Sequence, residues 1–168
     1  MRNSLFTNHQ LLFTNPGFTL IEVLVAVGII GILTSIGVSS YNSFNAKKQV
    51  ESVAEELKTN LRLVQSKAVN NEKDSSVCSS TPLDGWVADF SSNSYYGQCG
   101  IPTFGSKTLV DLDVDDDGTD DISLSWNGAI LFKVLGGTDL ASDITITVSD
   151  GVPARNVEVT VSTSGEIE

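Results

Sequence analysis

The densest group of potential ligand side chains is a run of aspartates between residues 111 and 121. Its members are Asp111, Asp113, Asp115, Asp116, Asp117, Asp120 and Asp121. Carboxylates at alternate positions, followed by a glycine such as Gly118 that allows a sharp turn, form the first half of a loop that wraps Ca²⁺ in hard oxygen ligands. The sequence therefore makes Ca²⁺ the candidate cofactor, with four expected ligands: Asp113, Asp115, Asp117 and Asp121.

This aspartate run is not a complete EF-hand loop. Counted from Asp113, the twelfth position is Leu124, where an EF-hand needs a bidentate Glu, although Asp121 can close a shorter loop. Mg²⁺ suits such a flexible cage of protein ligands less well. The alternative is a solvated acidic turn between two strands, in which salt screens part of the repulsion. The sequence leaves both interpretations open.

Residues that would support catalysis or nucleic-acid binding are scarce. The single histidine, His9, lies near the N-terminus, and no Ser or Cys sits in a recognisable nucleophile motif. We therefore expect no enzyme activity. The chain has 10 Lys and Arg against 21 Asp and Glu, a net charge of −11 that would repel a phosphate backbone. Nucleic acid is consequently not an expected partner.

An apolar run covers residues 18–38, and it is the element that shapes the N-terminal part of the chain. Its 21 positions match the ~20 residues that a helix needs to cross a hydrocarbon core. Glu22 is the one ionisable residue in the run, and an unpaired carboxylate in a membrane helix costs at least ~2.5 kcal/mol. Glu22 therefore either reaches water at the membrane interface or needs a positively charged partner.

The two cysteines, Cys78 and Cys99, both lie downstream of the apolar run. If that run is a membrane segment, both cysteines lie on the exported side, where disulfides form. A bridge between them would contribute ~3 kcal/mol through loop closure. The alternative is a pair of unrelated buried thiols.

A second helical pattern follows the apolar run. Apolar residues recur at steps of three and four, namely Val50, Val53, Ala54, Leu57, Leu61, Val64 and Ala68. This spacing is typical of an amphipathic helix. No proline interrupts residues 18–70, so we expect one helix whose first half needs lipid or other apolar helices and whose second half lies on a sheet.

Short β-type runs follow Asn70, and they predict a mostly antiparallel sheet. The expected strands are 86–90, 94–98, 108–112, 122–126, 129–134, 144–148 and 156–161, with 91–93 as a hairpin turn. The last two strands alternate apolar and polar residues, as in Ile144, Ile146 and Val148. The aromatic residues of these strands are expected in the core or half-exposed, with an adhesive patch as the alternative. The predicted fold class is α+β.

Residues 17–26 read GFTLIEVLVA, which resembles the cleavage and methylation signature of type IV prepilins and pseudopilins. The resemblance implies cleavage by a prepilin peptidase after Gly17, N-methylation of Phe18 and an assembly role for Glu22. In that role the carboxylate would pair with the charged amine of Phe18 on a neighbouring subunit. Residues 1–16 contain a single basic residue, Arg2, whereas leaders of this family usually carry Lys or Arg just before the glycine.

The second half resembles the globular domain of H-type minor pseudopilins of type II secretion and of fimbrial T-type minor pilins. The resemblance rests on residues 85–87, 130–132, 143–146, 155–159 and 164–167. Some T-type relatives bind DNA through a basic C-terminal stretch, whereas this chain ends in Gly-Glu-Ile-Glu.

Together the two resemblances imply a pilin fold, in which a long helix packs on a β-rich domain. The expected parts are a leader at 1–17, a transmembrane and filament-core helix at 18–40, an amphipathic helix at 41–71 and an exported domain at 72–168. The expected function is that of a minor pilin or pseudopilin, anchored once in the inner membrane and assembled with other such subunits into an extracytoplasmic filament. The alternative is a filament-tip module that binds DNA, a surface or a secreted substrate.

Overall fold

The computed structural model describes residues 17–115 and 118–168, with no side chains described for residues 36–39. The chain divides into two compact units, Met1–Tyr41 and Asn42–Glu168. Apart from Gly17, the leader expected at residues 1–17 lies outside the described residues. The division into four parts made from the sequence stays a prediction.

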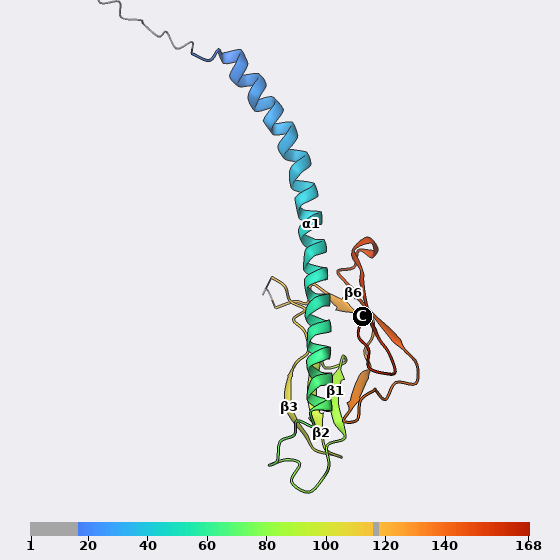
Figure 1. The fold of residues 1–168 in the computed structure, drawn as a ribbon. Coiled ribbons are helices and arrows are strands. Elements are labelled where there is room, and N and C mark those ends of the chain that lie inside the picture. Colours follow the sequence, from blue (N-terminus) through green and yellow to red (C-terminus); the bar gives the residue numbers. More distant parts are fainter. Residues whose placement is uncertain (1–16, 116–117) are drawn as a thin grey trace, which may run out of the picture. The chain divides into compact units, whose positions relative to one another are not determined.

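A single helix, α1, runs from Leu20 to Val69, as expected from the sequence (Figure 1). Among the described residues, α1 is the one helix long and apolar enough to cross a membrane. Its segment within Asn42–Glu168 buries one stripe of side chains, namely Val50, Val53, Ala54, Leu57, Leu61, Val64 and Ala68. These are the residues whose spacing predicted the amphipathic half.

Two antiparallel sheets accompany α1. Sheet A has the strand order β3 (Thr103–Thr108), β2 (Ser94–Gln98), β1 (Gly85–Asp89), β5 (Ala129–Lys133). Sheet B has the order β4 (Ser123–Leu124), β6 (Ile144–Ser149), β7 (Val157–Val161), and a short 3-10 helix, η1 (Pro153–Arg155), precedes β7. Every strand pair is antiparallel, which confirms the predicted α+β fold class.

The helix and both sheets share one hydrophobic core. In sheet A, the register places Trp86 opposite Phe132 and Ala88 opposite Ile130, so these side chains lie on one face and are all buried. In sheet B, the buried residues are Ile146, Val148, Val159 and Val161, which confirms the alternation predicted for the last two strands. The β1–β2 hairpin turns at residues 91–93, also as predicted.

The strand predicted at residues 108–112 is wrong, because the structure ends β3 at Thr108. Leu109 and Val110 are buried in the core. The Leu109 N–H donates to the Asn93 backbone carbonyl at 2.9 Å, and asparagine side chains bond the other backbone groups of the two residues. Asn93 donates from Nδ2 to the Val110 carbonyl and accepts from the Val110 N–H, while Asn60 of α1 donates to the Leu109 carbonyl. Two asparagines thus replace the ladder of a strand.

Burial within α1 yields a matched pair of leucine substitutions. Leu61 is completely buried, whereas Leu63, two residues further along the same helix, is 41% exposed. We expect Leu61→Ala to lower the free energy of unfolding by about 2–5 kcal/mol because it opens a cavity in the core. Leu63→Ala changes the same helix propensity and should cost less than about 1 kcal/mol. Chemical denaturation of both variants measures the difference, and equal losses would contradict the packing described here.

Candidate functional site

The junction between Gly17 and Phe18 lies in non-helical backbone immediately before α1. The Phe18 side chain is 82% exposed. A Cβ built on Gly17 would meet no atom within 4 Å, so packing within this chain does not require glycine at this position. A peptide that is exposed and not held in a helix is accessible to a protease.

Thr19 caps the N-terminus of α1. Its carbonyl accepts the N–H groups of Glu22 and Val23, and its hydroxyl accepts the N–H of Glu22 at 3.3 Å. Thr19 is therefore the N-cap and Glu22 is the third helical residue, the arrangement found in the threonine half of a capping box. The helix begins directly after this cap, at Leu20, so the Gly17–Phe18 junction lies outside the helix.

The carboxylate of Glu22 has no hydrogen-bond or ion-pair partner within the described part of the chain. It lies in the first turn of α1, where the partial positive charge of the helix N-terminus favours an anion. That helix dipole offsets only part of the cost of a carboxylate in an apolar medium. In an apolar medium a full counter-charge for Glu22 would have to come from another group, whereas at the membrane interface water could solvate the carboxylate.

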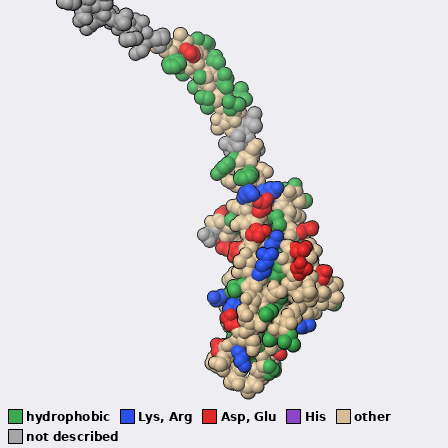
Figure 2. Space-filling view, in the orientation of Figure 1, with side chains coloured by type: hydrophobic (Ala, Val, Ile, Leu, Met, Phe, Trp, Pro, Cys, Tyr) green, Lys and Arg blue, Asp and Glu red, His purple; other side chains and the backbone are tan. Residues whose placement is uncertain are grey.

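The apolar part of α1 in unit Met1–Tyr41 exposes many large hydrophobic side chains, and Figure 2 shows one face of this surface. Leu20, Val27, Ile30 and Leu33 are all more than 60% exposed. The hydroxyls of Thr34 and Ser35 donate to carbonyls of the preceding turn, at 2.8 Å in both cases. Because these donors are satisfied within the helix, the surface presented outward is suited to lipid or to other apolar helices.

Three of the four predicted calcium ligands come together in the acidic loop. Asp113, Asp115 and Asp121 each place one carboxylate oxygen so that the three atoms lie within 4.8 Å of one another. Oxygens on opposite sides of a Ca²⁺ ion are about 4.6–5.2 Å apart, because each lies 2.3–2.6 Å from the ion. The spacing of the three carboxylates therefore fits Ca²⁺. The fourth predicted ligand, Asp117, lies outside the described residues.

Hydrogen bonds from backbone N–H groups to aspartate carboxylates join residues of the acidic loop to one another. Asp121 accepts from the Val114 N–H at 3.0 Å, and Asp113 accepts from the Gly118 N–H at 2.7 Å. Gly118 has a φ of +87°, a conformation that favours glycine. Leu124, which stands where an EF-hand would have its last ligand, belongs to β4 and packs against the core. The loop is thus shorter than an EF-hand, and Ca²⁺ binding stays a prediction.

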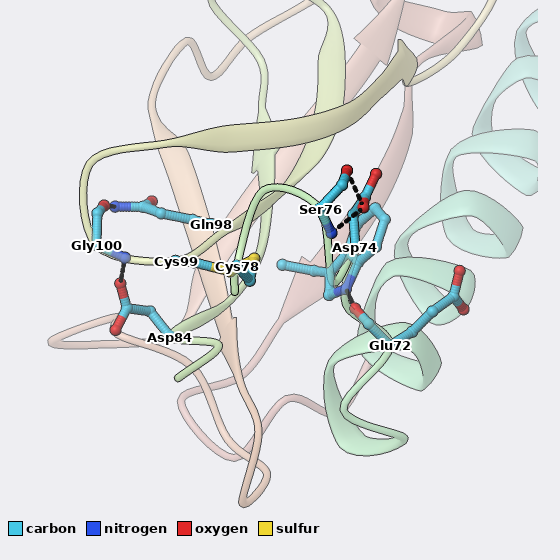
Figure 3. Close-up of a disulfide and its surroundings, with 9 residues drawn as sticks. Glu72, Asp74, Ser76, Cys78, Asp84, Gln98, Cys99 and Gly100 are labelled. Carbon is cyan, nitrogen blue, oxygen red and sulfur yellow. Dashed lines mark hydrogen bonds between the residues drawn. A yellow bond between two sulfur atoms is a disulfide. The ribbon is translucent and has the colours of Figure 1, made fainter. Parts of the chain in front are cut away.

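A disulfide joins Cys78 to Cys99, which confirms that the two cysteines are paired (Figure 3). Both are almost completely buried, and the bridge ties the segment after α1 to the end of β2. Asp84 accepts the Gly100 N–H at 2.6 Å beside the bridge. In the same segment, the hydroxyl of Ser76 donates to Asp74 and lowers the pKa of that carboxyl below its ordinary value.

Two functional features of the structure were absent from the sequence interpretation. Thr19 was not recognised as a cap, although the spacing Thr-x-x-Glu at Thr19 and Glu22 is the sequence signature of a capping box. The aromatic residues are divided between core and surface: Trp86 and Tyr95 are buried, whereas Tyr96 and Trp126 are half-buried. The four aromatics therefore do not form one exposed adhesive patch.

Comparison with known proteins identifies two family models in the chain. Residues 14–38 match the prokaryotic N-terminal methylation motif, and residues 53–165 match the type II transport protein GspH. The second match covers more than half of the chain and includes α1 from residue 53 onward, the acidic loop and both sheets. No curated protein and no solved structure matches the chain significantly.

The disulfide should stabilise the fold against unfolding. Its cysteines are 21 residues apart, and closing a loop of that length in the unfolded chain contributes about 3 kcal/mol. We expect Cys78→Ser to lower the free energy of unfolding by about that amount. The wild type should also migrate more slowly after reduction on a denaturing gel, whereas Cys78→Ser should migrate identically with and without reductant. A wild-type band that does not shift would contradict the bridge.

The acidic loop provides a test of calcium binding. If Ca²⁺ binds the folded loop, a concentration of 100 times its Kd should add about 2.7 kcal/mol to stability and raise the melting temperature relative to a chelator. Asp121→Asn removes one of the three clustered carboxylates and should abolish the rise. Asp120→Asn is the control, because it removes a neighbouring charge outside the cluster. A wild-type melting temperature unaffected by chelator would favour the solvated turn.

Proposed function

This chain belongs to the family of the type II transport protein GspH, and on that premise we propose that it is matured after Gly17 and assembled through α1 into a filament. Proteins of this family are structural minor pseudopilins. The observation that carries the proposal is the pairing of a prepilin methylation motif at residues 14–38 with the globular family domain at residues 53–165. The filament is a type II secretion pseudopilus or a type IV pilus.

Processing by a prepilin peptidase is supported by the local structure of the junction. Gly17 and Phe18 lie before the Thr19 cap, where the backbone is non-helical and exposed. Since no atom of the described residues restricts a side chain at Gly17, the glycine is best explained by the needs of an enzyme that acts on the adjacent bond. Cleavage there leaves Phe18 as a new N-terminus with a free amine, which is the group that N-methylation modifies.

Anchoring in the inner membrane is supported by the exposed apolar surface of α1. The methylation motif and the apolar helix fit a single-pass inner-membrane protein whose globular domain is exported. The Cys78–Cys99 bridge agrees with this orientation, because disulfides persist in oxidising compartments outside the cytoplasm. The same apolar surface that faces lipid before assembly would face the α1 helices of other subunits in the filament.

Glu22 supplies a reason for ordered assembly. Its carboxylate lacks a partner within the described part of the chain, and an apolar filament core would penalise it as lipid does. The amine of Phe18 on a neighbouring subunit offers the missing positive charge. Pairing the two buried groups would align the helices in one register, which is the best-attested use of buried ion pairs.

The alternative function, a tip module that binds DNA, is not favoured. The net charge of −11 opposes a polyanion, and the chain ends with Glu166 and Glu168 where a DNA-binding relative would have basic residues. We therefore assign the chain a structural role and propose no catalytic group in it.

A substitution at Glu22 separates maturation from assembly. In a strain that carries the peptidase and the filament machinery, mass spectrometry of the wild type should show loss of residues 1–17 and a methyl group on Phe18. Glu22→Gln should be cleaved in the same way, because the residues around the scissile bond are unchanged. It should disappear from the sheared filament fraction, because the neutral amide cannot pair with the Phe18 amine.

Glu55→Gln is the matched control, since Glu55 lies on the exposed face of α1 in unit Asn42–Glu168 and pairs with Lys58. It should be cleaved and assembled as the wild type is. An intact leader on the wild-type protein would contradict the proposed maturation. Normal filament incorporation of Glu22→Gln would instead show that Glu22 reaches water and that no charge pair aligns the subunits.

A further inference from the structure

A groove of about 350 Å³ is lined by the C-terminal end of α1, the segment that follows the helix and sheet A. Three lysines line it: Lys67 of α1, Lys73 of the following segment and Lys107 of β3. Trp86 and Phe104 line it as well, with their rings packed edge to face at a centroid distance of 5.4 Å. The groove therefore places ammonium groups from three segments beside an aromatic surface.

A bulge in β3 turns Lys107 toward this groove. Phe104 of β3 stands opposite Gly97 of β2. Lys107 stands opposite Tyr95, so three steps along β3 match two steps along β2. Tyr95 and Gly97 are two residues apart and share one face of the sheet, so Phe104 and Lys107 share that face too. The extra residue is accommodated at Gly105, whose φ is +66°. In a regular strand, Lys107 would point to the opposite face from Phe104.

The lysines of the groove are only partly neutralised. Lys67 pairs with Glu72. Lys73 and Lys107 are exposed, and neither forms an ion pair with a carboxylate in the described part of the chain. Asp74 also lines the groove, and its carboxylate accepts hydrogen bonds from its own segment. Three lysines thus stand against two acidic residues, which leaves the groove with an excess of positive charge.

Two other hollows of unit Asn42–Glu168 have the opposite charge. One is lined by a single basic residue and three acidic ones, namely Lys48, Glu56, Asp111 and Asp113. The other has no basic residue among its described lining residues, and its acidic ones are Asp115, Asp121 and Asp150. The chain as a whole has a net charge of −11. The groove at the end of α1 therefore differs in sign from its surroundings and would attract an anionic partner.

We propose that this groove binds an acidic segment of a partner protein, in which carboxylate side chains flank an apolar residue. The carboxylates would pair with Lys73 and Lys107. The apolar residue would pack on Phe104, which is half-buried and lines the groove. Charge complementarity between the lysines and the acidic segment carries the proposal. The proposed contact uses the globular unit alone and does not depend on maturation or on assembly through α1.

The acidic residues of the groove favour a peptide over a phosphate group as the ligand. A peptide brings backbone N–H donors as well as carboxylate acceptors, so it can also form hydrogen bonds with Glu72 and Asp74. A phosphodiester brings only acceptors, and the same two carboxylates would repel it. Exposed ion pairs are individually weak and are screened by salt. We therefore expect a transient contact that selects its partner by charge.

A peptide library tests the chemistry of the ligand without assuming its sequence. Short random peptides displayed on phage are selected at low salt on the full chain in detergent, and in parallel on the variant Lys73→Ala combined with Lys107→Ala. Peptides that bind the wild type and not the double variant should be enriched in Asp and Glu on both sides of an apolar residue. Selected peptides without acidic enrichment, or the absence of any peptide that depends on the two lysines, would overturn the proposal.

A labelled copy of the most enriched peptide measures the size of the effect. Its affinity for the double variant should fall about tenfold, because two exposed ion pairs are lost. Lys133→Ala is the matched control, since Lys133 is equally exposed and unpaired but lies on β5 outside the groove. Circular dichroism checks that both variants are folded. An equal loss of affinity in Lys133→Ala, or unchanged affinity in the double variant, would contradict binding in the groove.

Inorganic phosphate distinguishes a peptide groove from a general anion site. Phosphate should displace the labelled peptide no better than chloride does at the same ionic strength, because Glu72 and Asp74 accept hydrogen bonds only from a donor. Both salts should weaken the peptide complex as the ionic strength rises toward about 1 M, where the Debye length is about 3 Å. If phosphate displaces the peptide at concentrations where chloride does not, the groove is a simple anion site and the proposal fails.

Discussion

A single stripe of α1 carries Val50, Leu57, Leu61 and Val64, and both sheets bury their apolar faces in the core that this stripe forms. No ladder of hydrogen bonds joins a strand of sheet A to a strand of sheet B among the described residues. The helix is therefore the common support of the two sheets. Each fully buried aliphatic side chain contributes about 1.5–3 kcal/mol, so the stripe outweighs any single polar contact in this unit.

Polar contacts then determine where the surrounding segments lie on α1. Arg62 donates to the Ile167 carbonyl and Gln65 to the Gly165 carbonyl, so the C-terminal segment follows the helix. Asn60 makes the equivalent contact with Leu109 on the way to the acidic loop. These polar side chains of α1 donate hydrogen bonds to backbone carbonyls of the neighbouring segments. The positions of the loop and of the chain end thus depend on the orientation of one helix.

Patterns among neighbouring residues predicted the elements whose formation does not depend on distant parts of the chain. The periodicity of α1 and the alternation around Ile146 and Val159 require no knowledge of distant residues, and the structure contains both elements. The segment at Leu109 was misassigned because its burial depends on Asn60 and Asn93, which lie far away in the sequence. The sequence pattern of an apolar run is the same whether its backbone groups form hydrogen bonds with a neighbouring strand or with an asparagine.

The candidate sites divide in the same way. The signature around Gly17 is contiguous and could be recognised directly, and Thr19 was available from the spacing of a capping box. The convergence of Asp121 with Asp113 requires a folded loop whose backbone bonds are not visible in the sequence. The groove lined by Lys67, Lys73 and Lys107 could not be predicted from the sequence, because its lysines come from α1, the segment after it and β3.

Cleavage after Gly17 would change the electrostatics of the helix start, which links maturation to assembly. In the uncleaved chain, the carboxylate of Glu22 has only the partial charge of the α1 N-terminus as compensation. Cleavage creates a full positive charge on Phe18, immediately before the Thr19 cap. A subunit that kept its leader would have no charged amine at Phe18, so it could not neutralise the Glu22 carboxylate of a neighbouring subunit. Assembly in register would consequently be restricted to matured subunits, without a separate recognition step.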